Sequence, residues 1–130
     1  MLLDTSGLLC LHHRAEPFHD DARAAYQAAR VRLTHCYVLA EFVALAHVRH
    51  LPRLPALTFL GDLLDNPDIE TVWVDEPLHR EAVALLFTRT DKTYSLCDAV
   101  SFVLMRSRGL NEALTTDRHF EQEGFRRLLV

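Results

Sequence analysis

Four carboxylates stand in sequence contexts that ordinary folding does not explain. Asp4 and Asp117 each end a short strand-like run, and Glu41 and Asp98 lie inside the two most apolar helical segments. A carboxylate within an apolar segment must be protonated, paired or metal-bound, because an unpaired buried charge costs on the order of 3 kcal/mol or more. Carboxylate oxygens suit Mg²⁺ and Mn²⁺. We therefore predict that the four acids meet and hold a divalent metal ion.

Each acid also has a structural interpretation of its own. Asp98 follows Ser95 by three residues, which is the spacing of a helix capping box, and capping and metal binding can coexist. Glu41 could pair with a distant arginine, while Asp4 could cap the first helix and Asp117 a turn. One shared site accounts for all four acids at once, which four separate explanations do not.

Alternating strand-like and helix-like segments predict how the acids are positioned. We expect strands at residues 1–3, 31–35, 69–74, 113–116 and 127–130. Helices are expected at residues 7–13, 18–30, 37–49, 52–65, 77–88 and 95–108. Strands separated by helices of this kind are typical of a parallel sheet with helices on both faces. Right-handed crossovers then bring the carboxyl ends of the strands, with Asp4 and Asp117, to one edge where ligands bind.

The surroundings of the first and second acids follow from the same pattern. We expect a buried first strand that carries Asp4 into solvent at its tip. Thr5 and Ser6 are expected to cap the helix that begins around Gly7, so that its N-terminal amides favour an anion in the same space. Glu41 is expected to be buried, because the helix around it is apolar on nearly all sides.

Length and composition favour one compact domain over residues 1–130. The formal net charge of -4 argues against a broad electrostatic hold on nucleic acid, but it permits a local one, since metal-binding acids contribute to that charge. Because the cysteines are odd in number and lack a metal-binding spacing, we expect reduced core thiols at Cys10, Cys36 and Cys97. No apolar stretch is long enough for a membrane span and no basic leader is present, which favours a cytoplasmic protein with no membrane partner.

Four segments carry a resemblance to a known family. They are Leu3-Asp4-Thr5-Ser6, the lone Glu41 in its apolar helix, Ser95-Leu96-Cys97-Asp98-Ala99-Val100-Ser101-Phe102, and the segment from Leu114-Thr115-Thr116-Asp117 to Gly124-Phe125. In this order they resemble the PIN-domain family, and within it the VapC-type toxins of bacterial toxin–antitoxin pairs, over essentially the whole chain. The resemblance implies a three-layer α/β domain with a parallel central sheet of four to five strands and helices on both faces. Thr116 departs from the apolar residue more common there, which casts little doubt on activity.

The resemblance also implies an activity and a partner. It points to a Mg²⁺- or Mn²⁺-dependent endoribonuclease that an antitoxin holds inactive, with a bound water oriented for in-line attack on phosphorus. We assign Asp4 and Asp98 as the primary metal ligands. Glu41 and Asp117 are assigned as secondary ligands or water-orienting groups. Supporting roles fall to the neighbouring hydroxyl residues, which are Thr5, Ser6, Ser95 and Thr115.

Substrate binding must come from groups other than the acids, because carboxylates repel phosphate. The residues expected to rim the pocket and contact RNA are Arg89, Lys92, Arg118 and His119. Asp91 is either an outer acid of the site or a surface turn residue. The leucine-rich helix over residues 52–65 faces an antitoxin segment, a second copy of the chain in a homodimer, or simply the core.

Other functions remain compatible with parts of the pattern. The main alternative is a catalytically inactive binding module for RNA or protein on the same fold. A phosphoryl-transfer domain with Asp4 as nucleophile is disfavoured, because Ser6 stands where a second acid would be expected. Zinc is disfavoured as well, since His47 and His50 have no third ligand at the spacing of a zinc hydrolase.

Overall fold

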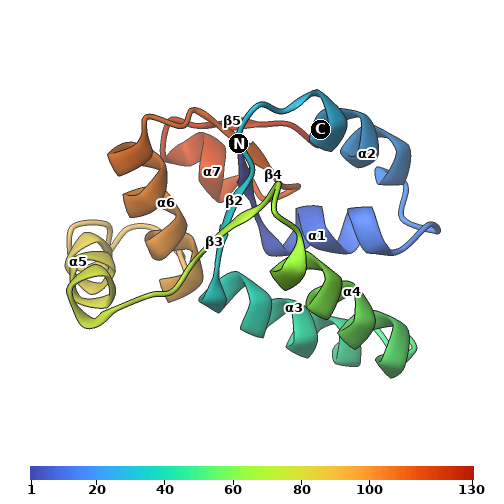
Figure 1. The fold of residues 1–130 in the computed structure, drawn as a ribbon. Coiled ribbons are helices and arrows are strands. Elements are labelled where there is room, and N and C mark those ends of the chain that lie inside the picture. The colour runs from blue at the N-terminus through green and yellow to red at the C-terminus, as the bar shows by residue number, and fades with distance from the viewer.

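Short parallel strands form the centre of the molecule, and the computed structural model describes all residues from 1 to 130 (Figure 1). The strands are β1 (Leu2–Leu3), β2 (Leu33–His35), β3 (Glu70–Val72), β4 (Glu112–Leu114) and β5 (Arg126–Arg127). The helices are α1 (Thr5–His12), α2 (His19–Ala28), α3 (Cys36–Val48), α4 (Arg53–Asp65), α5 (Glu76–Phe87), α6 (Leu96–Arg108) and α7 (His119–Gln122).

The five strands make one sheet in the order β3-β2-β1-β4-β5, and every neighbouring pair is parallel. This confirms the predicted parallel sheet of four to five strands. The chain builds outward from β1 to β3 and then returns to the other side of β1 to add β4. The carboxyl ends of β1 and β4 therefore flank the point where the strand order reverses, which is where ligands bind in open parallel sheets.

Helices cover both faces of the sheet, as the sequence predicted. Leu3 belongs to an apolar cluster with residues of α1, α2, α3 and α4, whereas Leu2 packs with α5, α6 and α7. Neighbouring residues of a strand point to opposite faces, so these two leucines anchor the two layers. Figure 1 shows α5, α6 and α7 gathered on one side of the strands and α1, α3 and α4 on the other.

Two local features fix the helices nearest the acids. In α1, Gly7 lies so close to β4 that an added Cβ would be 2.0 Å from the carbonyl oxygen of Leu114. Helix α6 begins with a complete capping box, in which Ser95 and Asp98 each accept the other's backbone N–H. It ends at Gly109, whose φ of 64° is the left-handed conformation that glycine adopts readily. The close approach at Gly7 thus holds α1 against β4, and the two caps define where α6 begins and ends.

Three differences from the sequence-based expectations stand out. The four-residue helix α7 was not predicted, because it is too short to show a periodicity. The predicted capping of the first helix by Thr5 and Ser6 is wrong: α1 already begins at Thr5, and Asp4, the residue that precedes it, makes no side-chain capping bond. The last strand lies at Arg126–Arg127, slightly earlier than expected. No helix combines the length and the apolar character needed to cross a membrane.

Candidate metal centre

Asp4 lies at the carboxyl end of β1, held from two sides. Its backbone N–H donates to the carbonyl of Leu114 in β4, and its Oδ2 accepts from the Thr115 hydroxyl at 2.7 Å. Only 4% of the residue is exposed, so the expectation that it projects into solvent is wrong. Burial raises the pKa of its carboxyl to about 7, the charges of Asp98 and Glu41 add to this, and the Thr115 hydrogen bond opposes it. A nearby cation would therefore stabilise the ionised form of this buried carboxyl.

A chain of hydroxyl groups fixes that orientation. Because the Thr115 proton is used on Asp4, the Ser6 hydroxyl must donate to Thr115 Oγ1, 3.1 Å away. Ser6 Oγ accepts in turn from the backbone N–H of Thr116, and Thr115 Oγ1 accepts from the backbone N–H of Asp117. The hydroxyls of α1 and of the segment after β4 therefore position two acids together. Thr5, the other predicted supporting residue, is buried with no hydrogen-bond partner for its hydroxyl.

Asp98 enters from the first turn of α6. Its Oδ2 accepts the Ser95 backbone N–H at 3.0 Å and faces His119 Nδ1 at 3.2 Å. Burial raises the pKa of the Asp98 carboxyl; the Ser95 hydrogen bond opposes that effect and the charge of Asp117 adds to it. The capping-box interpretation is confirmed. It coexists with a position beside the other acids, as the sequence allowed.

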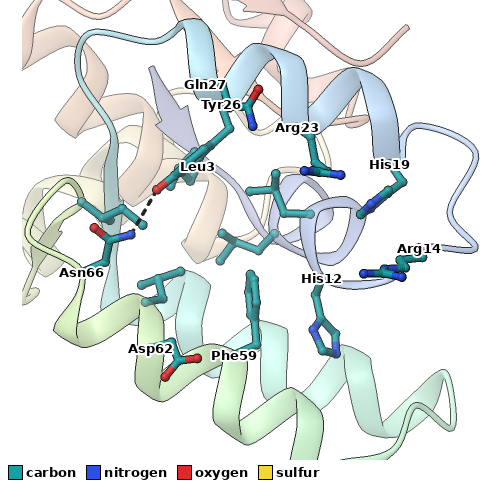
Figure 2. Close-up of a pocket in the computed structure, with 14 residues that line it drawn as sticks. Leu3, His12, Arg14, His19, Arg23, Tyr26, Gln27, Phe59, Asp62 and Asn66 are labelled. Atoms are coloured by element: carbon teal, nitrogen blue, oxygen red, sulfur yellow. Dashed lines mark hydrogen bonds between the residues drawn. The ribbon is translucent and has the colours of Figure 1, made fainter.

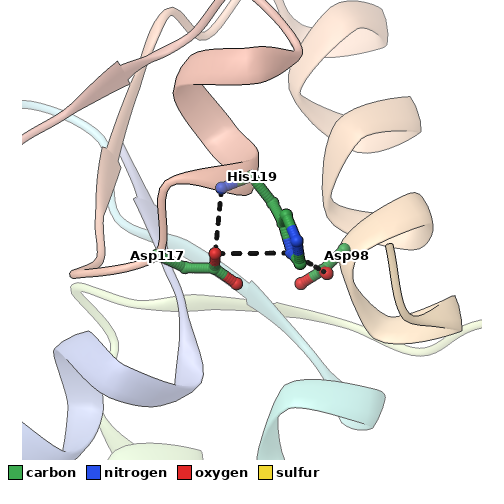
Figure 3. Close-up of side chains that lie close together, drawn as sticks. All are labelled: Asp98, Asp117 and His119. Carbon is green, nitrogen blue, oxygen red and sulfur yellow. Dashed lines mark hydrogen bonds and ion pairs between the residues drawn. The ribbon is translucent and has the colours of Figure 1, made fainter. Parts of the chain in front are cut away.

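Asp117 and His119 complete a compact group with Asp98 (Figure 3). One ligand atom from each of the three residues lies within 4.8 Å of the other two, a spacing that suits a shared metal ion. Asp117 Oδ1 accepts the backbone N–H of His119 at 2.9 Å and lies 3.4 Å from its Nδ1. His119 was expected to contact RNA at the rim. The structure places its imidazole between two acids, at the start of α7, and the RNA contact stays a prediction.

Glu41 differs from expectation in its exposure. The residue is exposed, so the prediction that it is buried is wrong: α3 turns Phe42 into the core and leaves the neighbouring face open. It nevertheless lies within electrostatic reach of Asp4 and of the Cys97 thiol, whose pKa is raised by burial first and then by the charges of Glu41, Asp4 and Asp98. Cys97 is thus a neutral thiol beside three acids. Its apolar sequence context gave no sign of that position.

The donor set fits a hard divalent cation. None of Asp4, Glu41, Asp98 and Asp117 forms an ion pair with lysine or arginine, and His119 is the only other basic side chain that contacts them. Two of these acids are buried, and carboxylates gathered without a counter-charge are unfavourable unless they are protonated or bound to a cation. The oxygens of Asp98 and Asp117 could therefore hold Mg²⁺ or Mn²⁺. Asp4 and Glu41 lie outside this closest group, within electrostatic reach of one another.

The other cations predicted to contact RNA have different surroundings. Arg89 donates to Glu123 at 2.7 Å, and Glu123 also binds Arg106, an ion-pair group that the sequence did not reveal. Lys92 has only the exposed Asp91 beside it, at 3.6 Å. Arg118 is exposed, forms no ion pair, and directly follows Asp117. Of these cations, Arg118 has no acidic partner, and Lys92 has only this one ion pair with an exposed acid.

The raised pKa of Asp4 predicts that the metal-free protein loses stability as the pH rises. This carboxyl ionises near 3.8 when unfolded and near 7 when folded, so the folded state binds more protons between these values. Its contribution to stability is complete below pH 4 and is lost as the pH rises through 7. We expect the unfolding midpoint in EDTA to fall by roughly 6–10 °C more in the wild type than in Asp4→Asn between pH 5.5 and 8. Equal pH dependence in the two proteins would contradict this.

A separate cavity of about 550 Å³ lies between α1, α2 and α4 (Figure 2). Its floor is apolar, with Leu11 and Phe59, and none of the four acids lines it. Arg14 and Arg23 stand at its rim and form no ion pair. The cavity is thus a second feature of the surface, lined by apolar residues, by two arginines and by Asp62.

Comparisons with known proteins agree with the architecture. A family model described as the PIN domain matches residues 1–125. A solved structure of the Mycobacterium tuberculosis toxin VapC20, described as cleaving the Sarcin-Ricin loop, is similar with a TM-score of 0.86 and 26% identity over 95% of each chain. A toxin–antitoxin complex from Klebsiella pneumoniae has a TM-score of 0.62 and 18% identity, over 90% of this chain and 86% of that one. No curated protein matched the chain.

Proposed function

The chain belongs to the PIN-domain family, and from that premise we propose that it is a divalent-metal-dependent endoribonuclease and the toxin of a toxin–antitoxin pair. The observation that carries the proposal is the grouping of Asp98 and Asp117, with the buried Asp4 in electrostatic reach of Asp98, at the switch point of the sheet without any lysine or arginine to neutralise them. The similarity to VapC20, whose description names an RNA-cleaving toxin, supports the substrate class.

We propose the role of each acid from how firmly its side chain is held. Asp4, fixed by Thr115, and Asp98, fixed by Ser95, are the primary ligands. Asp117 and the exposed Glu41 are suited to orient a water or to complete the ligand set, because they are less buried. When bound, the divalent ion supplies an acidified water and offsets charge on the phosphate.

Metal removal tests the activity directly. We expect the purified protein to cleave RNA in Mg²⁺ or Mn²⁺, to lose cleavage in EDTA, and to regain it when the ion is restored in excess. The mechanism needs the ion both to neutralise the acids and to activate water. Cleavage that persists after exhaustive chelation contradicts the metal dependence. RNA binding without any cleavage in either ion would favour the inactive-module alternative.

Arg118, after β4, and Lys92, before α6, are proposed to contact the RNA backbone. Replacing Arg118 with alanine is expected to weaken RNA binding and to lower the slope of log affinity against log salt by about 1, the loss of one phosphate contact. Arg30→Ala is the matched control, because Arg30 is also exposed but precedes the amino end of β2, whereas the acids lie at the carboxyl ends of the strands. Binding isotherms on one short RNA at several salt concentrations make the comparison. An equal loss in both variants contradicts a local contact.

Protein partners are proposed on the same basis. The cavity between α1, α2 and α4 is suited to an antitoxin segment, because apolar residues form its floor and unpaired arginines its rim. The α4 surface, with Leu54 and Leu57 exposed, is suited to a homodimer. Coexpression with the product of an adjacent small reading frame should abolish cleavage, and light scattering should give twice the 14.9 kDa chain mass. A persistent monomer or undiminished cleavage contradicts the respective proposal.

A further inference from the structure

His119 is the only nitrogen donor among the acids. Its Nδ1 lies 3.2 Å from Asp98 Oδ2 and 3.4 Å from Asp117 Oδ1 (Figure 3). Two neighbouring ligands of one octahedral ion, each about 2.1 Å from it, lie roughly 3 Å apart. The imidazole nitrogen is therefore spaced from each carboxylate as a ligand that shares one ion with it, and the ligand atoms of all three residues lie within 4.8 Å of one another.

Contacts of Nε2 and of the ring hold the imidazole so that Nδ1 points toward the acids. Nε2 lies 3.0 Å from the Thr93 hydroxyl, and the ring packs edge-on against the buried Tyr94 at 5.2 Å between centroids. Without an ion, Nδ1 faces carboxylate oxygens and donates to Asp98 Oδ2. In the ion-bound form the Thr93 hydroxyl accepts the Nε2 proton, which leaves the Nδ1 lone pair for an ion held between the acids. Metal-binding histidines are commonly oriented by such a hydrogen bond from the other ring nitrogen.

We infer that His119 is itself a metal ligand through Nδ1, together with Asp98 and Asp117, and that the centre prefers first-row transition ions such as Mn²⁺ over Mg²⁺. The inference rests on the proposed metal-dependent function and deepens it by naming a fifth residue and a metal preference. A nitrogen ligand adds affinity for transition ions, whereas Mg²⁺ favours oxygen. An imidazole that only hydrogen-bonds to Asp98 would give no such preference.

Pulsed electron paramagnetic resonance of Mn²⁺ bound to the intact chain tests the inference without any catalytic readout. We expect modulation from a directly bound ¹⁴N nucleus in the wild type, and its replacement by the ¹⁵N pattern when only histidine is isotopically labelled. His119→Gln should lose the nitrogen signal. The matched control is His47→Gln, which removes an exposed histidine from α3 and should retain it.

Titration with each ion alone supplies a second readout. His119→Gln is expected to lose about tenfold or more of the Mn²⁺ affinity and much less of the Mg²⁺ affinity. Mn²⁺ that binds the wild type, depends on Asp98, and shows no histidine nitrogen overturns the inference and leaves the proposed function intact. Failure of the wild type to bind either ion overturns both. The labelled wild-type spectrum decides the matter even if His119→Gln does not fold.

Discussion

Replacing Asp4 with asparagine is expected to reduce RNA cleavage about a hundredfold or more while leaving the metal-free fold at least as stable at pH 8. The catalytic loss follows because Asp4 is proposed as a primary ligand. The stability follows because the wild-type carboxylate is buried and, at that pH, ionised without a lysine or arginine partner. The asparagine keeps the shape of the side chain, and its carbonyl oxygen can still accept the Thr115 hydroxyl. Cleavage rates and unfolding midpoints in EDTA are to be measured together.

Asp91→Asn is the matched control for that variant. Asp91 lies in the loop before α6, its side chain is 73% exposed, and only Lys92 lies beside it. We expect this substitution to leave cleavage within about twofold of the wild type. A loss of activity in Asp4→Asn that is accompanied by an equal loss of stability would point to a structural role instead. Undiminished cleavage and metal affinity in Asp4→Asn would show that Asp4 is not a metal ligand.

Gly7→Ala is expected to destabilise the protein by about 3 kcal/mol or more, lowering the melting temperature by roughly 10 °C or preventing folding. The added methyl group would lie 2.0 Å from the Leu114 carbonyl oxygen and 2.7 Å from its carbon. Both are backbone atoms of β4 and cannot move aside like the end of a flexible side chain. Relieving the overlap must separate α1 from β4, and this also separates Ser6 from Thr115.

Gly61→Ala provides the comparison within the same chain. Gly61 lies within α4, is exposed, and an added Cβ there would meet nothing within 4 Å. Alanine at such a helical position is expected to raise stability by about 0.5–1 kcal/mol. Thermal unfolding of the two variants should therefore shift in opposite directions. A midpoint for Gly7→Ala close to that of the wild type would contradict the close approach of α1 and β4.

Sequence could predict those parts of the structure in which a local pattern is compatible with only one fold. The parallel sheet followed from strands separated by long helices, and the helix starting near Ser95 followed from its capping-box spacing. Asp4 and Asp117 were placed at one edge because the carboxyl ends of parallel strands must meet there. Their roles as metal ligands stay predictions.

The parts that sequence missed depend on contacts between distant segments. Glu41 is exposed although its helix is apolar, because the apolar count of a helix does not say which side faces the core. His119 lies between two acids only because the brief α7 turns it inward. Glu123 binds both Arg89 and Arg106, which no spacing in the chain indicates. Tertiary packing decided each of these.

The hydrogen bond between Thr115 and Asp4 joins residues 111 positions apart, so the order of synthesis matters. A ribosome adds roughly 5–20 residues per second, which places roughly 6–22 seconds between the first acid and the threonine that orients it. Until β4 emerges, the nascent polypeptide has no assembled centre. The proposed metal centre therefore assembles only after most of the chain has been synthesised.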